Sequence, residues 1–347
     1  MNSIDKKIKV GVICDQFGNL QRGGAELQVE NTVNYLVKTG VVDVEYITYQ
    51  TTDLSQYDII HIFKSIFEFT PVALSAKKLG IPYVLSTITF PKNYWFDLYT
   101  YKFSRFLPLK MKSIFSPGRR ITLWDNADFL FPNTDMEAEF LRKVTANRNI
   151  EIVPNGLDLT EFTPPDEKYF FSSYPELKNK KFVLNVARIE KRKNQKNLIF
   201  ACKELNIPLV VIGKIGDENY YQEILDIGYT NFYYLGPLYN RELLFSAYAA
   251  CQVFCLPSTV ETPGIAAMEA AYYNKPLVIT KKGGTQYYFN DKALYVDWKD
   301  IKGIKNAILA SYNKNNVNTK DLISEYSWDK VAAKYIRLYR QILANKK

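Results

Sequence analysis

Two glutamates separated by seven residues, Glu261 and Glu269, carry the clearest chemical signal in this chain. Glu261 lies in a short polar loop after an apolar stretch that ends at Pro257, and Glu269 lies in the second or third turn of the helix that follows, with Pro263 in its first turn. The N-terminus of such a helix offers backbone N–H groups and the positive end of a dipole, which favour a phosphate or a sugar oxygen. The two carboxylates could therefore accept hydrogen bonds from two sets of hydroxyls on one ligand. The same spacing also fits a solvated surface glutamate beside an ordinary helix glutamate.

Two cations follow a predicted strand in the second half of the chain. Arg188 ends the segment KFVLNVAR, and Lys193 comes five residues later in RIEKRKNQKN. Arg offers a forked donor and Lys a point charge, a combination that suits a diphosphate. A solvated basic loop is the alternative, and Lys191 or Arg192 could replace Lys193 in the diphosphate site.

Paired glycines follow two of the predicted strands, as Gly23-Gly24 after the first strand and as Gly283-Gly284 after KPLVIT. Glycine lets the backbone approach a ligand without a Cβ clash. Each pair also fits a simple turn, and neither has the spacing of the dinucleotide-binding fingerprint.

Strands and helices alternate along the chain, and the strands are short, nearly continuous apolar runs. This pattern is typical of parallel sheets covered by helices on both faces. The predicted strands are IKVGVIC, VDVEYITY, DIIHIF, IPYVLSTI and DFLFPN in the first half, then KFVLNVAR, PLVVIG, FYYLG, CQVFCLP and KPLVIT.

We therefore predict an α/β protein with two doubly wound, Rossmann-like domains that face each other across a cleft. The segment VPNGLDLTEFTPPDEKYF, rich in Pro, Gly and Asp, is predicted to link them. The predicted boundaries are 1–160 for the first domain, 161–326 for the second, and 327–347 for an amphipathic C-terminal helix that could pack on either domain. Ligands of such sheets bind outside the carboxyl ends of the strands.

Composition supports this organisation. A chain of 347 residues exceeds the usual size of one core, and 47% hydrophobic content leaves material for two. The first residues show no apolar signal core, and no stretch approaches the roughly 20 apolar residues of a membrane span. Four cysteines without metal-ligand spacing and a single histidine make a zinc site improbable, so we expect no metal and a cytoplasmic location.

The net charge of +9 is concentrated in a basic aromatic segment between Lys92 and Arg120. This segment interleaves cations with Trp, Tyr and Phe residues. It suits an anionic membrane interface or, less well, single-stranded nucleic acid. An ordinary helix pair with a packed aromatic face and a solvated basic face fits the same pattern.

These motifs together resemble those of a known family. The chain is similar to family 4 glycosyltransferases, which have the GT-B fold and retain the configuration of the transferred sugar. The resemblance runs over nearly the whole chain and is strongest from Val153 to Gly284. It is carried by VPNGLD, by the Arg188 and Lys193 pair, by YYLG ending at Gly236, and by LPSTVETPGIAAMEA with its two glutamates.

The resemblance implies that the domain 1–160 binds the acceptor and that the domain 161–326 binds the nucleotide-sugar. It also implies roles for individual residues. Arg188 and Lys193 would hold the diphosphate and stabilise the charge that develops on it, and Glu261 would contact hydroxyls of the donor sugar. Glu269 would bind the ribose hydroxyls. Backbone groups around the donor would come from the following residues: Gly24, Gly236 near the base, Gly264, Ile265 and Gly284. No metal or other cofactor is implied, because the cations take the place of Mg²⁺, and UDP is favoured over GDP.

The sequence departs from the family at three positions. Thr89 stands where many members have a His, Ala187 replaces a frequent Gly, and Tyr287 stands where a Glu often follows the Gly-Gly pair. The only histidine, His61, lies on an apolar strand and is predicted to be a core residue. An unusual donor sugar would fit these changes.

The sequence thus favours transfer of a sugar from a nucleotide-diphosphate donor to a glycan or lipid-linked acceptor, in surface polysaccharide or glycoconjugate synthesis. The enzyme would work in the cytoplasm, with its basic aromatic segment near the membrane. A nucleotide-sugar epimerase of related fold and a non-catalytic sugar-binding protein are the alternatives. Nucleic-acid binding is not expected, because only the net charge favours it.

Overall fold

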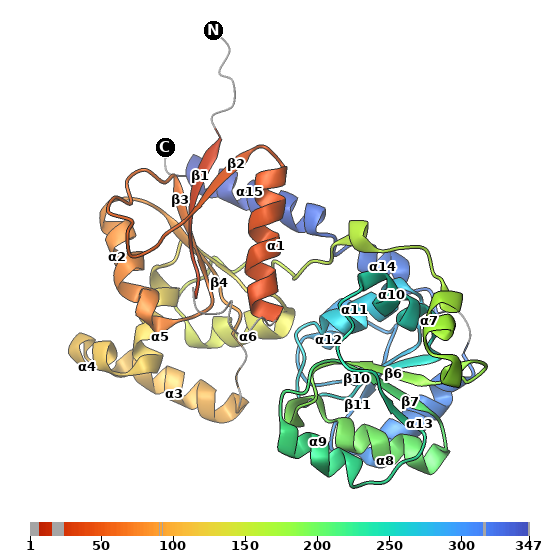
Figure 1. The fold of residues 1–347 in the computed structure, drawn as a ribbon. Coiled ribbons are helices and arrows are strands. Elements are labelled where there is room, and N and C mark those ends of the chain that lie inside the picture. The colour runs from red at the N-terminus through yellow and green to blue at the C-terminus, as the bar shows by residue number, and fades with distance from the viewer. Residues whose placement is uncertain (1–6, 16–23, 90, 92, 315–316, 346–347) are drawn as a thin grey trace. The chain divides into compact units, whose positions relative to one another are not determined.

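The chain forms two compact units, which Figure 1 shows as ribbons. The computed structural model describes residues 7–15, 24–89, 91, 93–314 and 317–345. The first unit comprises Met1–Gly156 with Trp328–Lys347, and the second comprises Leu157–Ser327. The second unit therefore begins at Leu157, whereas the sequence predicted residue 161.

The first unit is built on a five-stranded parallel sheet with the order β2-β1-β3-β4-β5. Since β1 pairs with β2 on one side and with β3 on the other, the strand order reverses direction between β1 and β3. The strands are β1 Ile8–Ile13, β2 Val42–Tyr46, β3 Ile59–Phe63, β4 Tyr83–Ser86 and β5 Phe129–Phe131.

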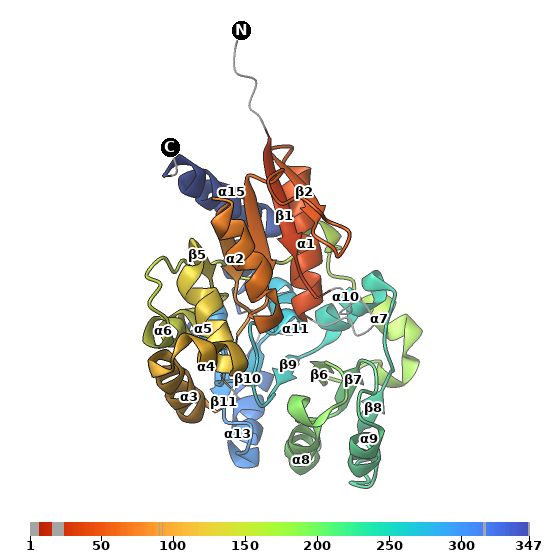
Figure 2. The ribbon, with the colours of Figure 1, turned by 90° about the vertical axis from the view of Figure 1, so that its left-hand side faces the viewer.

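Helices cover both faces of this sheet (Figures 1 and 2). Alternate residues of β3 point to opposite faces, as the pleat requires. Ile59 and Phe63 pack with α1 (Gly24–Lys38) and α15 (Trp328–Ala344), whereas Ile60 and Ile62 pack on the other face. The helices on that other face include α2 Thr70–Lys78, α3 Tyr94–Phe106, α5 Ser116–Asn126 and α6 Asp135–Val144, and α4 Leu109–Ile114 lies against α5.

The C-terminal helix α15 packs on the first unit through both apolar and polar contacts. His61 on β3 is fully buried, with Nδ1 2.6 Å from the Tyr339 hydroxyl and Nε2 2.8 Å from the Ser86 hydroxyl. Ser86 is in turn 2.9 Å from the hydroxyl of Tyr335. Both tyrosines belong to α15. The prediction that His61 is a satisfied core residue is therefore confirmed.

A second buried polar group, the carboxylate of Glu137 on α6, lies at the carboxyl ends of β4 and β5. It accepts hydrogen bonds from the Thr87 hydroxyl at 2.5 Å, the Thr89 amide at 2.6 Å and the Asn133 amide at 2.8 Å. Burial raises the pKa of Glu137 to about 7, although these donors oppose the shift. Glu137 thus fixes the loop after β4 through its hydrogen bonds with Thr87 and Thr89.

The second unit is built on a six-stranded parallel sheet with the order β11-β10-β9-β6-β7-β8. Its order reverses between β6 and β9, which are neighbours. The strands are β6 Val183–Val186, β7 Leu209–Ile212, β8 Phe232–Tyr234, β9 Val253–Leu256, β10 Leu277–Thr280 and β11 Leu294–Val296.

Two separate apolar clusters cover the faces of this sheet. On one face lie α7 Glu167–Ser173, α10 Arg241–Ala250, α11 Ile265–Tyr272, α12 Thr285–Phe289 and α14 Lys320–Ser324. On the other lie α8 Gln195–Leu205, α9 Glu218–Leu225 and α13 Ile301–Tyr312. Cys251 and Cys255 are buried core residues, as predicted.

The structure corrects two sequence predictions. The strand β11 was not predicted, because three residues, Leu294–Val296, give too short an apolar run. Part of the predicted linker is helix α7, whose Phe170 is fully buried. The aromatic residues that end the Pro-rich segment therefore belong to the core of the second unit.

The stability of the first unit should depend on pH through His61 and Glu137, with opposite signs. Burial lowers the pKa of His61 from 6.5 to about 3, so stability is lost as the pH falls from 6.5 toward 3. The pKa of Glu137 is raised from 4.5 to about 7, so its contribution is fully present below pH 4.5 and is lost as the pH rises through 7. The two pH dependences therefore oppose each other between pH 4.5 and 6.5.

Single substitutions should separate the pH dependence due to Glu137 from that due to His61. In Glu137→Gln, stability should fall with falling pH by up to about 1.4 kcal/mol per pH unit more than in the unmodified protein. In His61→Gln, stability should instead rise with falling pH. Urea unfolding at several pH values within this window measures both slopes, and identical slopes in all three proteins would contradict the assignment.

Candidate functional site

The predicted site residues of the second unit gather after the carboxyl ends of β6, β9 and β10. Arg188 follows β6, and Lys193 ends a short 3-10 turn, Lys191–Lys193, that leads into α8. Glu261 follows β9 and forms an isolated bridge with Gly283, which follows β10. Because the strand order reverses between β6 and β9, these loops flank the point where ligands of doubly wound sheets bind.

Glu261 is held by side-chain and backbone contacts from two loops. Its Oε1 accepts a hydrogen bond from Lys193 Nζ at 2.5 Å and lies 3.8 Å from Arg192 Nη1. Its amide donates to the carbonyl of Lys282 at 3.1 Å, and its carbonyl accepts from the amide of Gly284 at 2.9 Å. The side chain is only 7% exposed, so its charge requires the cation beside it. Lys193 keeps further N–H donors that a ligand could use.

Gly283 makes this arrangement possible. Its φ is +114°, a value that L side chains rarely adopt, and a Cβ atom there would lie 2.0 Å from the carbonyl oxygen of Glu261. The paired glycines after β10 therefore serve the close approach of two backbones, and Gly284 provides the amide that holds Glu261.

Arg188 contacts a different carboxylate. Its Nη2 lies 3.6 Å from Oε2 of Glu190, and Arg192 Nη2 lies 3.0 Å from Oε1 of the same residue. The Arg188 side chain is half exposed, with its carbonyl fixed by the Gln195 side chain at 2.9 Å. Three cations, Arg188, Arg192 and Lys193, thus surround two carboxylates, which leaves a net positive charge.

The three neighbouring basic residues of the 3-10 turn contact different carboxylates. Lys191 Nζ lies 3.7 Å from Glu223 on α9, and its side chain is 68% exposed. Lys193 is 14% exposed and turns toward Glu261, with Arg192 between the two carboxylates Glu190 and Glu261. Of the alternatives that the sequence left open, Arg192 remains close to Lys193, whereas Lys191 belongs to another contact.

Glu269 on α11 is buried, and its carboxylate is bound by two residues of α10. The Tyr248 hydroxyl donates to Oε2 at 2.6 Å, and Arg241 Nη2 donates to Oε1 at 3.2 Å. Burial raises the pKa of Glu269, and Arg241 and Tyr248 oppose that shift. Arg241 also donates to Glu161 at 2.8 Å. Sequence analysis missed both α10 residues, because nothing in their spacing indicates a contact with α11.

The helix α11 begins at Ile265, and Gly264 is its N-cap with a φ of +84°. Pro263 therefore precedes the helix, which corrects the prediction that it lies in the first turn. The amides of Ala267 and Met268 donate to the carbonyl of Gly264 at 2.8 and 3.2 Å, which leaves the amides of Ile265 and Ala266, at the helix start, as those suited to an anion. Gly236 follows β8, and its carbonyl accepts from the amide of Gly213 at 2.9 Å.

Two predicted residues lie in the first unit. Gly24 is the exposed first residue of α1, whereas Gly23 lies outside the described residues. Thr89 follows β4, with its amide bound to Glu137 and its hydroxyl donating to the carbonyl of Thr87 at 3.0 Å. Thr89 is thus fixed by a backbone and a side-chain hydrogen bond.

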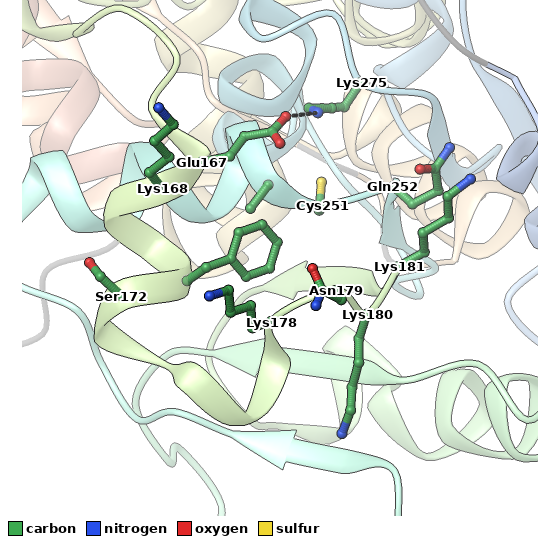
Figure 3. Close-up of a pocket in the computed structure, with 12 residues that line it drawn as sticks. Glu167, Lys168, Ser172, Lys178, Asn179, Lys180, Lys181, Cys251, Gln252 and Lys275 are labelled. Atoms are coloured by element: carbon green, nitrogen blue, oxygen red, sulfur yellow. Dashed lines mark ion pairs between the residues drawn. The ribbon is translucent and has the colours of Figure 1, made fainter.

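A pocket of about 530 Å³ occupies the opposite edge of the second sheet (Figure 3). It lies where β6, β9 and β10 begin, and its lining includes Lys178, Lys181 and Lys275, the last paired with Glu167 at 3.9 Å. Ligands of parallel sheets bind at the carboxyl ends of the strands. The geometry therefore separates this pocket from the site of Lys193 and Glu261.

The described residues contain no cluster of three or more His, Cys, Asp or Glu side chains suited to a metal ion. Within the same residues, no helix has the length and apolar character needed to cross a bilayer.

Comparison of the whole chain with solved structures defines its fold. Sucrose-phosphate synthase from Thermosynechococcus elongatus superposes with a TM-score of 0.75 at 17% identity, over 98% of this chain and 100% of that one. Anabaena Alr3699/HepE in complex with UDP-glucose gives 0.68 at 17% identity, over 96% and 100%. The two parallel α/β units are those of the GT-B glycosyltransferase fold.

Sequence comparison relates the second half of the chain to a known family. Residues 166–336 match the model of the family described as glycosyl transferases group 1. The D-inositol 3-phosphate glycosyltransferase of Corynebacterium urealyticum is 27% identical over 245 residues, 63% of this chain and 58% of that protein. The glycogen synthase of Clostridium novyi is 25% identical over 261 residues, 60% and 53% respectively. The chain therefore matches about half the length of these relatives, and residues 166–336, which lie mostly in the second unit, carry the match to the group 1 family of glycosyl transferases.

The close approach at Gly283 leads to a test of how Glu261 is positioned. Gly283→Ala should destabilise the second unit by at least about 2 kcal/mol, because it combines backbone strain with a clash against Glu261. Gly284→Ala is the matched control, since the φ of −89° at Gly284 suits any residue. Urea unfolding followed by tryptophan fluorescence measures both, and equal stability of the two variants would contradict the proposed constraint.

Proposed function

We propose that this protein is a retaining, metal-independent glycosyltransferase that moves a sugar from a nucleotide-diphosphate donor to a glycan or lipid-linked acceptor. The observation that carries the proposal is the contact between Lys193 and Glu261 at the point where the strand order of the second sheet reverses. It places a cation and a carboxylate beside each other in a region with excess positive charge. This is the chemistry needed to hold a diphosphate and the hydroxyls of the sugar attached to it.

Each charged residue has a proposed role, which the family resemblance implies and which its contacts allow. Lys193 and Arg188 bind the diphosphate, and Glu261 accepts hydrogen bonds from the donor sugar while it orients Lys193. Glu269, held by Tyr248, accepts from the ribose hydroxyls. Backbone amides at the start of α11 bind phosphate oxygens, and Gly236 lies near the base.

The proposed reaction depends on stabilising a leaving group rather than on a nucleophile of the protein. As the bond between the sugar and the diphosphate breaks, the anomeric carbon becomes oxocarbenium-like and negative charge builds on the departing phosphate oxygen. Lys193 and Arg188 stabilise that charge from fixed positions. The acceptor hydroxyl attacks from the face that the phosphate leaves and transfers its proton to the phosphate oxygen, so the configuration is retained.

The similar structures support a nucleotide-sugar donor and favour UDP as its nucleotide. Anabaena Alr3699/HepE is described in complexes with UDP and with UDP-glucose. The second unit is the proposed donor-binding unit, because it carries the charged residues, and the first is the proposed acceptor-binding unit. We place the enzyme in the cytoplasm, in the synthesis of a surface polysaccharide or glycoconjugate. An epimerase would convert the donor without an acceptor, and a binding protein would leave it unchanged, so a product assay separates them.

A ligand panel tests donor binding directly. UDP, GDP, ADP and their sugars would be compared by thermal shift, and a ligand at about 100 times its dissociation constant should stabilise the fold by about 2.7 kcal/mol. We expect the largest shift with a uridine nucleotide. Glu269→Gln should weaken that binding on the order of 10- to 100-fold, because it removes a charged acceptor from the ribose. Absence of any shift across the panel would refute the proposed donor site.

Variants of the cations test the proposed mechanism. Lys193→Ala and Arg188→Ala should each lower kcat on the order of 10²–10³-fold, since each removes a pre-oriented donor to the developing charge. Lys191→Ala is the control, because Lys191 contacts Glu223 instead. Turnover would be measured with the donor found in the panel, with and without a chelator. Wild-type rates in both variants, or loss of transfer on chelation, would overturn the mechanism.

A further inference from the structure

One face of the first unit exposes an unusual number of large apolar side chains. Of the 16 such side chains that are strongly exposed among the described residues, eight lie between Trp95 and Phe115. They are Trp95, Phe96, Tyr99, Phe103, Phe106, Met111, Ile114 and Phe115, which we call the aromatic face. A group of this size on a water-soluble surface marks a binding surface rather than chance exposure.

The aromatic face consists of a stripe along α3 and of further exposed side chains on and directly after α4. The spacing of Phe96, Tyr99, Phe103 and Phe106 is three or four residues, which places them on one side of a helix. Their exposed fractions range from 64% at Phe103 to 88% at Phe106. Figures 1 and 2 show α4 next to α3, and both helices pack against α5.

The opposite side of α3 is firmly anchored, so the aromatic face is not a loosely attached segment. Tyr101 is buried, with its ring 5.0 Å from that of Trp124 on α5 and 5.8 Å from that of Phe140 on α6. Its hydroxyl accepts a hydrogen bond from Arg120 at 3.1 Å. The helix therefore has two apolar sides, one buried in the unit and one directed to solvent.

The charges around the aromatic face are almost all positive. Lys102 and Arg105 are exposed on α3 itself, and Lys110 lies at the start of α4. Asp97 is the only acidic residue in the sequence from 91 to 120, and it caps the helix start by accepting from the amide of Asn93 at 3.1 Å. A protein partner with an apolar patch would explain the aromatic residues but not this excess of cations.

We infer that the aromatic face binds the surface of an anionic lipid bilayer. Trp, Tyr and Phe side chains enter the boundary between headgroups and acyl chains, while Lys102 and Arg105 pair with lipid phosphates. The protein lies on the bilayer rather than across it. This binding needs no sugar donor, so it is independent of the proposed transfer.

Vesicle sedimentation tests the inference with the full chain. The protein should sediment with phosphatidylcholine vesicles that contain phosphatidylglycerol, and at least about tenfold less with phosphatidylcholine alone. Phe103→Ser combined with Phe106→Ser should reduce sedimentation at least about tenfold, because it removes inserted aromatic groups. Tyr49→Ser combined with Leu309→Ser, which changes exposed apolar residues elsewhere, should sediment like the unmodified protein.

Fluorescence gives a second measurement of the same surface. Trp95 is 70% exposed, whereas Trp124 and Trp328 are buried and the half-buried Trp298 belongs to the second unit. Anionic vesicles should therefore shift the emission to shorter wavelength in the unmodified protein and not in Trp95→Phe. Lys102→Gln combined with Arg105→Gln should weaken binding and lower its dependence on salt.

Four outcomes would overturn the inference. They are failure to sediment with anionic vesicles, equal loss of sedimentation in the control variant, a dimer in solution that Phe103→Ser with Phe106→Ser abolishes, and binding of a single-stranded oligonucleotide by this face in place of vesicles. Because the substituted side chains are exposed, unchanged circular dichroism would show that the variants remain folded. Nucleotide-induced thermal shifts should persist in all of them, which keeps this test separate from that of the donor site.

Discussion

The ion pair between Lys193 and Glu261 is the contact on which the arrangement of the site depends. It joins the loop after β6 to the loop after β9, the two strands between which the sheet order reverses. A carboxylate that is 7% exposed would be costly without its cation, and the cation is itself only 14% exposed. The backbone supports the pair, because the loop after β10 bonds both the amide and the carbonyl of Glu261. Three strand ends are thereby tied to one charged contact.

Much of this arrangement could be predicted from the sequence. The parts that could not be predicted have one physical reason in common, which is that they depend on contacts between distant segments. Apolar runs reveal buried parallel strands, and polar residues after them mark the carboxyl edge, so Lys193 and Glu261 were predicted to lie together. The partners of Glu269 could not be predicted, since Tyr248 and Arg241 meet it through the packing of α10 on α11. The sequence indicates that the backbone at Gly283 can approach another group closely. It does not indicate that this group is the carbonyl of Glu261, because the two residues meet through a contact between distant loops.

The exposed side of the basic aromatic segment could not be predicted from the sequence either. Its sequence permits an ordinary packed helix, because aromatic residues occur at enough positions to cover either side of α3. Burial decides the matter: Leu98 and Tyr101 face the unit, whereas Trp95 and Tyr99 face solvent. Apolar residues on both sides give no clear amphipathic pattern, so only packing against α5 and α6 shows which side remains exposed.

In both sheets, charged side chains lie at the point where the strand order reverses, but the balance of positive and negative charge differs. In the first unit, Lys64 directly follows β3 and its ammonium donates to the carboxylate of Glu26 in the first turn of α1. Asp15 follows β1, so among the residues that the structure describes two carboxylates accompany one cation at this point. In the second unit, three cations accompany two carboxylates. A diphosphate requires the positive site, whereas a neutral sugar hydroxyl does not, and this difference supports the proposed assignment of donor binding to the second unit and acceptor binding to the first.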